Sequence, residues 1–191
     1  MSVFPVSYLE KLQKQILASP YLSVNNLNRD FVDTQGFSIV FQRAGIPQVE
    51  ERFPFLSPYL QRVLLPDCNA FYLNPLLLKQ GSRVDPHIDR SLRSYCKTID
   101  PPAWVSVLYL HLPTPLAGGS LILKSGKKQV GSILPQVNQL LYFQGNLTHA
   151  VTPLKSQGIR LSLVCEQYLL EAKALPEIPE FTLESRLLPR Y

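Results

Sequence analysis

The chain has 191 residues, which is enough for one domain with a sizeable buried core. Hydrophobic residues make up 46% of it and charged residues only 17%, a composition that excludes an intrinsically disordered chain. The formal net charge of +5 comes from scattered basic residues rather than one basic run, so it permits an anionic partner without requiring one.

The sequence indicates neither export nor membrane insertion. No segment approaches the about 18 consecutive apolar residues of a membrane-spanning helix. Residues 1–17 carry charged side chains within their apolar pattern, unlike a secretory signal. The cysteines Cys68, Cys96 and Cys165 are widely spaced, which favours free thiols over a zinc site or a disulfide framework. We therefore expect a cytoplasmic protein with no membrane partner.

The N-terminal part is predicted to combine helices with strands. Residues 6–17 have their apolar side chains at helical spacing, which predicts an amphipathic helix that ends before Pro20. Its apolar face comprises Leu9, Leu12, Ile16 and Leu17. Residues 37–41 are rich in strand formers, residues 58–65 are predicted to be helical, and residues 70–78 form an apolar strand.

From residue 86 onwards the pattern changes to short strands separated by turn residues such as Ser125-Gly126-Lys127. The predicted strands are residues 86–90, 104–112, 119–123, 129–134, 139–143, 149–152 and 159–168. Regular short strands with turns between them indicate an antiparallel β-sandwich or barrel. The proline-rich tail after Leu170 is expected either to pack along the surface or to fray.

Two of these strands carry candidate metal ligands. Residues two apart in a strand project from the same face, so His87 and Asp89 should point the same way. His149, from a later strand, supplies a second imidazole. Two histidines and one carboxylate suit non-haem Fe(II) and leave coordination positions open. A His-x-Asp pair also occurs often by chance, and the remaining histidine, His111, is interpreted as structural.

A candidate anion-binding arginine follows the second histidine. If residues 155–158 form a hairpin turn, Pro153 lies opposite Arg160, which places Arg160 roughly 13 Å along the ladder from His149 at about 3.3 Å per residue. A five-carbon dicarboxylate that chelates the metal could span that distance. The planar guanidinium binds a carboxylate in bidentate fashion, and Ser162 on the same face can donate a further hydrogen bond.

The set His87-x-Asp89, His149 and Arg160-x-Ser162 resembles the signature of the Fe(II)- and 2-oxoglutarate-dependent dioxygenases. The strand that contains Tyr109, followed by Gly118-Gly119-Ser120-Leu121, is most similar to the prolyl-hydroxylase branch. The resemblance covers about half of the chain, residues 73–168. It implies a mainly β fold with flanking helices around a double-stranded β-helix, a cupin-like jelly roll.

This resemblance predicts one domain that covers residues 1–191. Residues 1–68 are expected to form a buttress of helices and strands against the outer face of one sheet. Residues 69–170 are expected to form the jelly-roll catalytic core, and residues 171–191 the C-terminal tail.

The resemblance also implies roles for the site residues. His87, Asp89 and His149 would hold Fe(II). Arg160 would pair with the distal carboxylate of 2-oxoglutarate, and Tyr109 and Ser162 would donate hydrogen bonds to it. O2 would be the second cosubstrate, with succinate and CO2 as products. A plain core role for Tyr109 is the alternative. Because related halogenases need a small residue in place of the aspartate, hydroxylation is favoured over halogenation.

Departures from the family pattern concern the substrate side. Leu77 stands where many prolyl hydroxylases have a tyrosine, and Ser120 stands where an acidic residue is common. Nucleic-acid demethylases would have a further arginine at the position of Glu166. This chain has neither that arginine nor a stripe of basic residues, so we expect no nucleic-acid partner.

The predicted function is hydroxylation of a prolyl residue or a small metabolite. Arg90 and Arg93 follow the metal candidates closely and are candidates for anchoring an anionic substrate group, although solvated surface arginines are common. The alternative function is a non-oxidative, cupin-like metal-binding barrel without turnover, which would have no need of Arg160. The sequence predicts no oligomeric state and does not choose between a peptidyl and a small-molecule substrate.

Overall fold

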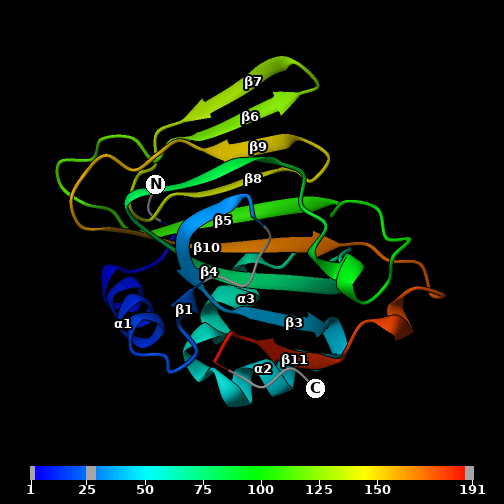
Figure 1. Ribbon diagram of the computed structural model, residues 1–191. Coiled ribbons are helices and arrows are strands. Elements are labelled where there is room, and N and C mark those ends of the chain that lie inside the picture. Colours follow the sequence, from blue (N-terminus) through cyan, green and yellow to red (C-terminus); the bar gives the residue numbers. More distant parts are fainter. Residues whose placement is uncertain (1–2, 25–28, 188–191) are drawn as a thin grey trace.

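The computed structural model describes residues 3–24 and 29–187 (Figure 1). Its strands form a curled antiparallel sheet with helices packed along one side (Figure 1). The predicted fold class, mainly β with flanking helices and a jelly-roll core, is confirmed. Along the main path of the sheet the strand order is β7-β6-β9-β4-β10-β5-β8. In addition, β2 and β3 pair with β4, β1 pairs with β2, and β11 pairs with β3.

The strands are β1 (Ser23–Val24), β2 (Phe31–Gly36), β3 (Ser38–Gln42), β4 (Ala70–His87), β5 (Trp104–His111), β6 (Leu121–Ser125), β7 (Lys128–Ile133), β8 (Leu140–Gln144), β9 (Thr148–Val151), β10 (Ile159–Tyr168) and β11 (Phe181–Glu184). The α-helices are α1 (Val6–Leu17), α2 (Ile46–Arg52) and α3 (Ser57–Val63). Short 3-10 helices include η3 (Ser91–Ser94). Among the described residues, no helix has the length and apolar character required to cross a bilayer.

Strand β4 links the two halves of the curled sheet. Its first part pairs with β10, and its end pairs with β9. The sequence predicted two separate strands here, residues 70–78 and 86–90, but the chain stays extended between them. Gly81 has a φ of 88° at the bend, a conformation that glycine adopts without steric cost. The Ser82 hydroxyl accepts the Lys79 N–H, so the bent backbone keeps its hydrogen bond.

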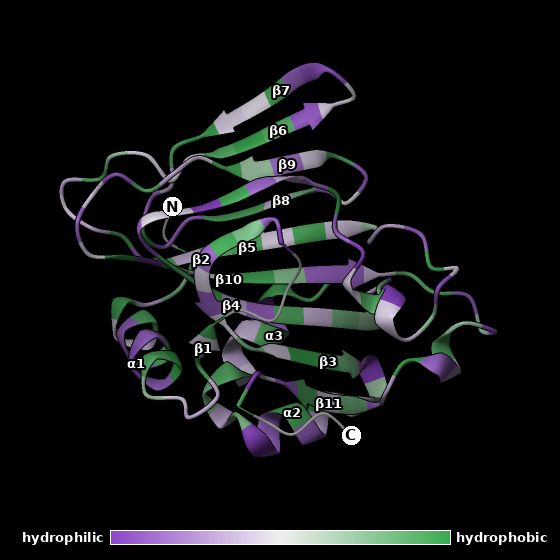
Figure 2. Cartoon of the chain, in the orientation of Figure 1, coloured by the Kyte–Doolittle hydropathy of each residue, from purple (hydrophilic) through white to green (hydrophobic). Residues whose placement is uncertain are grey.

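Helix α1 matches its predicted bounds and covers the outer face of the sheet. It buries Leu9, Leu12 and Ile16, and Figure 2 shows hydrophobic and hydrophilic residues alternating along it. Leu17, predicted to face the core, is instead 37% exposed because it lies one residue, or about 100° of helical turn, beyond this stripe. Helix α3 adds Leu60 to the same apolar cluster.

The central strand β10 is buried on both faces. Its odd-numbered residues Leu161, Leu163 and Cys165 pack in the cluster that contains the helices. Its even-numbered residues point into a cavity inside the curl; they are Arg160, Ser162, Val164 and Glu166. Successive side chains of a strand point to opposite faces, so one face of β10 packs in the core and the other lines the cavity.

The C-terminal tail completes the sheet. Strand β11 pairs with β3, with Phe181 opposite Phe41 and Glu184 opposite Ser38. Within residues 171–187, the tail therefore packs in register on an edge. Pro189, one of the prolines noted in the sequence, lies outside the described residues.

Candidate metal centre

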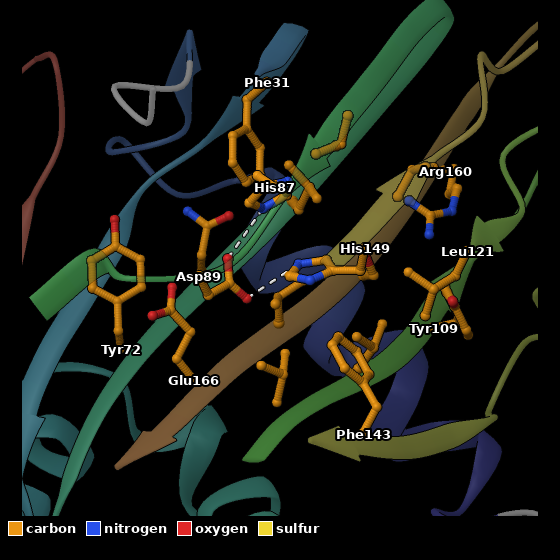
Figure 3. A pocket seen from close by; sticks show the side chains of 18 residues that line it. Phe31, Tyr72, His87, Asp89, Tyr109, Leu121, Phe143, His149, Arg160 and Glu166 are labelled. Atoms are coloured by element: carbon orange, nitrogen blue, oxygen red, sulfur yellow. Dashed lines mark hydrogen bonds and ion pairs between the residues drawn. The ribbon is translucent and has the colours of Figure 1, made fainter. Parts of the chain in front are cut away.

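Three candidate ligands converge inside the curl. His87 is the last residue of β4, and the register pairs it with His149 on β9. Asp89 lies two residues beyond the end of β4, so the prediction that it belongs to the strand is wrong. The irregular segment after the strand nevertheless brings its carboxylate to the histidines. One ligand atom from each of the three residues lies within 4.8 Å of the others (Figure 3).

Backbone carbonyls orient both imidazoles. Nδ1 of His87 lies 2.9 Å from the Asp85 carbonyl oxygen, and Nδ1 of His149 lies 3.2 Å from the Leu147 carbonyl oxygen. A carbonyl only accepts, so each Nδ1 carries the proton and donates. Each Nε2 in the neutral ring then presents its lone pair, which is the state that a metal ligand needs.

These lone pairs face a carboxylate. Nε2 of His87 lies 3.2 Å from Oδ1 of Asp89. Nε2 of His149 lies 3.2 Å from Oδ2, which has no partner in hydrogen-bond geometry. Acceptors at this distance repel one another unless a proton or a cation lies between them. The cluster is therefore built around a positive charge.

The close contacts between Asp89 and the two histidines also shift the pKa values of the cluster. Burial by itself would raise the pKa of Asp89, but the adjacent His149 and His87 hold it well below its usual range. Burial would lower the pKa of His87, but the hydrogen bond and charge of Asp89 outweigh burial and raise it. In the metal-free protein, a proton on His87 can supply positive charge; a divalent metal would replace it. The residues present thus fit a two-histidine, one-carboxylate metal site.

An apolar cavity surrounds the cluster. The empty space between its walls is about 560 Å³, part of which is open solvent, and only about 40 Å³ of it can hold the centre of a water-sized molecule. The ring centroid of Phe31 lies 5.0 Å from that of His87, and Phe143 lies 5.0 Å from His149. Aliphatic residues complete much of the wall; they are Leu76, Val84, Val105, Val107, Leu121, Val151 and Val164. Such a wall excludes water and fixes the imidazole rings by packing.

Arg160 lines the same cavity and is only 1% exposed. Among the described residues, its Nε and Nη1 have no partner in hydrogen-bond geometry, and the same holds for the hydroxyls of Ser162 and of Tyr109, although the Tyr109 hydroxyl lies close enough to interact with the guanidinium. The guanidinium carbon lies 5.1 Å from the centroid of the Tyr109 ring. Burial lowers the pKa of Arg160 and raises the pKa of Tyr109. A buried cation with unused donors is costly, so this group of donors fits an anionic ligand.

The route that brings Arg160 to the cavity differs from the predicted hairpin. Strand β9 pairs with β4 and β6, whereas β10 pairs with β4 and β5. Arg160 lies opposite Leu78, and no hairpin register with Pro153 exists. The assumed hairpin was wrong because consecutive strands of a jelly roll cross to different partners.

Sequence reasoning named Gly119 and Glu166 but assigned neither of them a role in the site. Gly119 has a φ of 70°, and a Cβ there would lie 3.3 Å from Cδ of Arg160, so the backbone supports the arginine side chain. Glu166 lines the cavity, although the sequence was used only to note the absence of an arginine there. The available signal for Glu166 was its spacing, since it shares a strand face with Arg160 and Ser162.

Other candidate residues lie outside this cavity. Arg90 is exposed, and Arg93 is half-buried with its Nε donating to the Ile99 carbonyl oxygen at 2.9 Å. Neither lines the cavity, so the structure does not bring them together with the metal cluster. His111 is half-buried at the end of β5, opposite Leu161, and is not part of the cluster.

No family model and no curated protein matches the sequence. Solved structures do resemble it. They include a prolyl-4-hydroxylase from Pseudomonas putida, 19% identical over 89% of this chain and 90% of that chain, with a TM-score of 0.59.

A prolyl hydroxylase from Trichoplax adhaerens, solved with a hypoxia-inducible-factor peptide fragment, is 18% identical over 92% of this chain and 82% of that one, with a TM-score of 0.58. A 2OG-Fe(II) oxygenase family protein from Burkholderia pseudomallei is 14% identical over 88% and 82%, also with a TM-score of 0.58. The fold of the chain is therefore that of these oxygenases.

Proposed function

We propose that this chain is an Fe(II)- and 2-oxoglutarate-dependent dioxygenase that hydroxylates a prolyl residue or a small metabolite. One observation carries the proposal. Arg160, buried and with unused donors, opens into the same cavity as a two-histidine, one-carboxylate cluster. The structural likeness to oxygenases gives independent support.

In this proposal, His87, Asp89 and His149 hold Fe(II). The carbonyl partners of the two imidazoles keep Nε2 deprotonated and fix both rings, as outer partners of metal ligands do. Asp89 supplies the single negative ligand. The aspartate also occupies the position where a halide would otherwise bind, which favours hydroxylation.

Arg160 binds the distal carboxylate of 2-oxoglutarate. Its Nε and Nη1 donate to the carboxylate oxygens, and the hydroxyls of Tyr109 and Ser162 add neutral donors. None of these donors has a partner in good hydrogen-bond geometry among the described residues, so binding would satisfy groups that burial has already desolvated. The strand register places Ser162 opposite Tyr109, which brings the two hydroxyl-bearing residues to one region of the cavity.

Bound Fe(II), with 2-oxoglutarate and O2 as cosubstrates, would supply the oxidising chemistry that yields succinate, CO2 and a hydroxylated substrate. The protein orients these groups and keeps water away with its aliphatic wall. The alternative function, a metal-binding barrel without turnover, leaves the burial of an unpaired Arg160 unexplained. Substrate contacts by Arg90 or Arg93 would require a substrate that extends outside the cavity, and they stay a prediction.

Anaerobic reconstitution tests the proposed cosubstrate. We expect the protein with one equivalent of Fe(II) to show a weak visible charge-transfer band only when 2-oxoglutarate is added, because the band requires chelation of the metal. Succinate, which cannot chelate through a keto acid, is the matched control. A protein that binds Fe(II) but develops no band with saturating 2-oxoglutarate would exclude this function.

Gly119 gives a second prediction about the same site. Gly119→Ala should lose about 1–2 kcal/mol of unfolding free energy from left-handed strain, and its new methyl group should displace the Arg160 side chain and weaken 2-oxoglutarate binding roughly tenfold. Gly126→Ala is the control, since Gly126 has a φ of 56° but nothing within 4 Å of the added Cβ. Denaturant titrations and calorimetry measure the two effects. Equal affinities in the two variants would mean that Gly119 does not position Arg160.

A further inference from the structure

Glu166 is a buried acidic residue that the proposed chemistry does not use. It is 4% exposed, lies near the C-terminal end of β10 and lines the cavity. It lies six positions beyond Arg160 along the strand, or about 20 Å at about 3.3 Å per residue. Figure 3 shows the metal cluster between the two, with Glu166 beside Asp89 and Arg160 on the far side of His149.

Three donors hold the Glu166 carboxylate in place. The Ser91 hydroxyl donates to Oε1 at 2.5 Å, and the Ser91 N–H donates to Oε2 at 3.2 Å. The Tyr168 hydroxyl also donates to Oε2. An ionised carboxylate has about four acceptor sites. One therefore stays available on a group that is already oriented at the cavity wall.

Among the residues that the structure describes, Glu166 has no cationic partner. In the part of the chain that the structure describes, its carboxylate forms none of the ion pairs. Burial, together with the negative charge of Asp89, raises the pKa of Glu166 to about 8, so most of the ligand-free carboxyl group is protonated at neutral pH. A cationic ligand beside it would favour the ionised carboxylate, which is then able to pair with that ligand.

The charges of the cavity leave Glu166 unbalanced. Apart from the histidines, its charged lining residues are Asp89, Arg160 and Glu166. A divalent metal and Arg160 together carry the charge that neutralises Asp89 and the two carboxylates of 2-oxoglutarate. When ionised, Glu166 then carries a negative charge that no described lining residue balances in this low-dielectric space.

We infer that Glu166 is a specificity-determining residue that binds a protonated amine of the substrate, on the opposite side of the metal cluster from Arg160. This inference rests on the proposed function and narrows its substrate class. A protonated primary amine or a protonated cyclic secondary amine, as in an unblocked amino acid, carries the required charge and N–H donors. A peptide-bonded proline does not, because its nitrogen has neither proton nor charge.

Matched probes test the inference by binding rather than by turnover. The protein is loaded anaerobically with Fe(II) and 2-oxoglutarate, and formation of the visible band is verified first. Calorimetry then compares n-butylammonium with n-butanol, and pyrrolidinium with tetrahydrofuran. Each pair has nearly the same shape and differs in charge. N-acetylprolinamide represents the peptide-bonded proline.

We expect at least one amine to bind about 10- to 100-fold more tightly than its neutral counterpart, the usual contribution of a buried hydrogen bond to a charged group. Glu166→Gln should remove this preference. Ser91→Ala should keep it, because it removes one anchoring hydroxyl and leaves the carboxylate charge. Circular dichroism and the visible band verify that each variant folds and binds the cosubstrate.

Several results would overturn the inference while leaving the proposed function intact. One is a wild-type protein, with its band formed, that binds neither amine better than its neutral counterpart; this needs no variant. A second is a preference for the amine that survives in Glu166→Gln. A third is a preference that Ser91→Ala removes as completely as Glu166→Gln does, because the effect would then come from the structure around Ser91 and not from the carboxylate charge. Tighter binding of N-acetylprolinamide than of pyrrolidinium would also overturn it. Failure of the band itself would instead contradict the proposed function.

Discussion

Replacing Arg160 with methionine should lower the affinity for 2-oxoglutarate by about 10²- to 10³-fold, the usual cost of losing one partner of a buried charge pair. The same change should leave the free energy of unfolding of the ligand-free protein unchanged or higher. The reason is that Nε and Nη1 of Arg160 are buried without partners, so the folded protein gains little from the charge. Apolar replacements of buried charges are often neutral or stabilising.

This pair of effects separates a ligand-binding arginine from a structural one. Calorimetry with 2-oxoglutarate and denaturant titration without it measure both quantities on the same variant. Arg93→Met is the matched control, because Arg93 is half-buried and bonds a backbone carbonyl outside the cavity. It should keep wild-type affinity for 2-oxoglutarate. An Arg160→Met protein that binds 2-oxoglutarate normally would show that the carboxylate lies elsewhere.

Ligand-induced stabilisation gives a second readout of the same variant. A ligand present at 100 times its dissociation constant stabilises the folded state by about 2.7 kcal/mol. With the metal bound, wild-type protein should show this increase on addition of 2-oxoglutarate, and Arg160→Met should not.

His149→Ala should abolish tight Fe(II) binding and, with it, turnover of 2-oxoglutarate. Loss of a residue that only orients a metal ligand typically costs 10- to 100-fold in metal affinity, so loss of a ligand itself should cost more. The variant retains the His87–Asp89 contact at 3.2 Å, which leaves two ligands for a site that needs three. Anaerobic metal titration followed by metal analysis of the desalted protein measures the effect.

His111→Ala is the control for this change. His111 is the one histidine of the chain besides His87 and His149, and it lies on β5 outside the cluster. Its variant should bind Fe(II) like the wild-type protein. If His149→Ala retained metal affinity or turnover, then His149 would not be a ligand and the assignment of the whole centre would need revision.

Some features of the fold followed from local sequence alone. The bounds of helix α1 and strand β10 were predicted because their apolar periods, 3.6 and 2, are properties of continuous segments. The segment from 70 to 87 was divided wrongly because a bent strand at Gly81 resembles a turn in sequence. Strands β2 and β11 were missed, since their pairing with β4 and β3 stabilises segments of weak local signal.

The site shows the same division. The sequence by itself determined which residue types were available and which shared a strand face. That was sufficient to select His87, Asp89, His149 and Arg160 as candidates. Only the tertiary structure decided that Asp89 reaches the histidines from beyond the end of β4 and that Glu166 lines the same cavity. It also decided that the strand of Arg160 pairs with β4 and does not form a hairpin with β9. The physical reason is that periodicity fixes the direction of a side chain within its own strand. Strand pairing between distant segments, which depends on burial and on the entropy of closing long loops, fixes what that side chain meets.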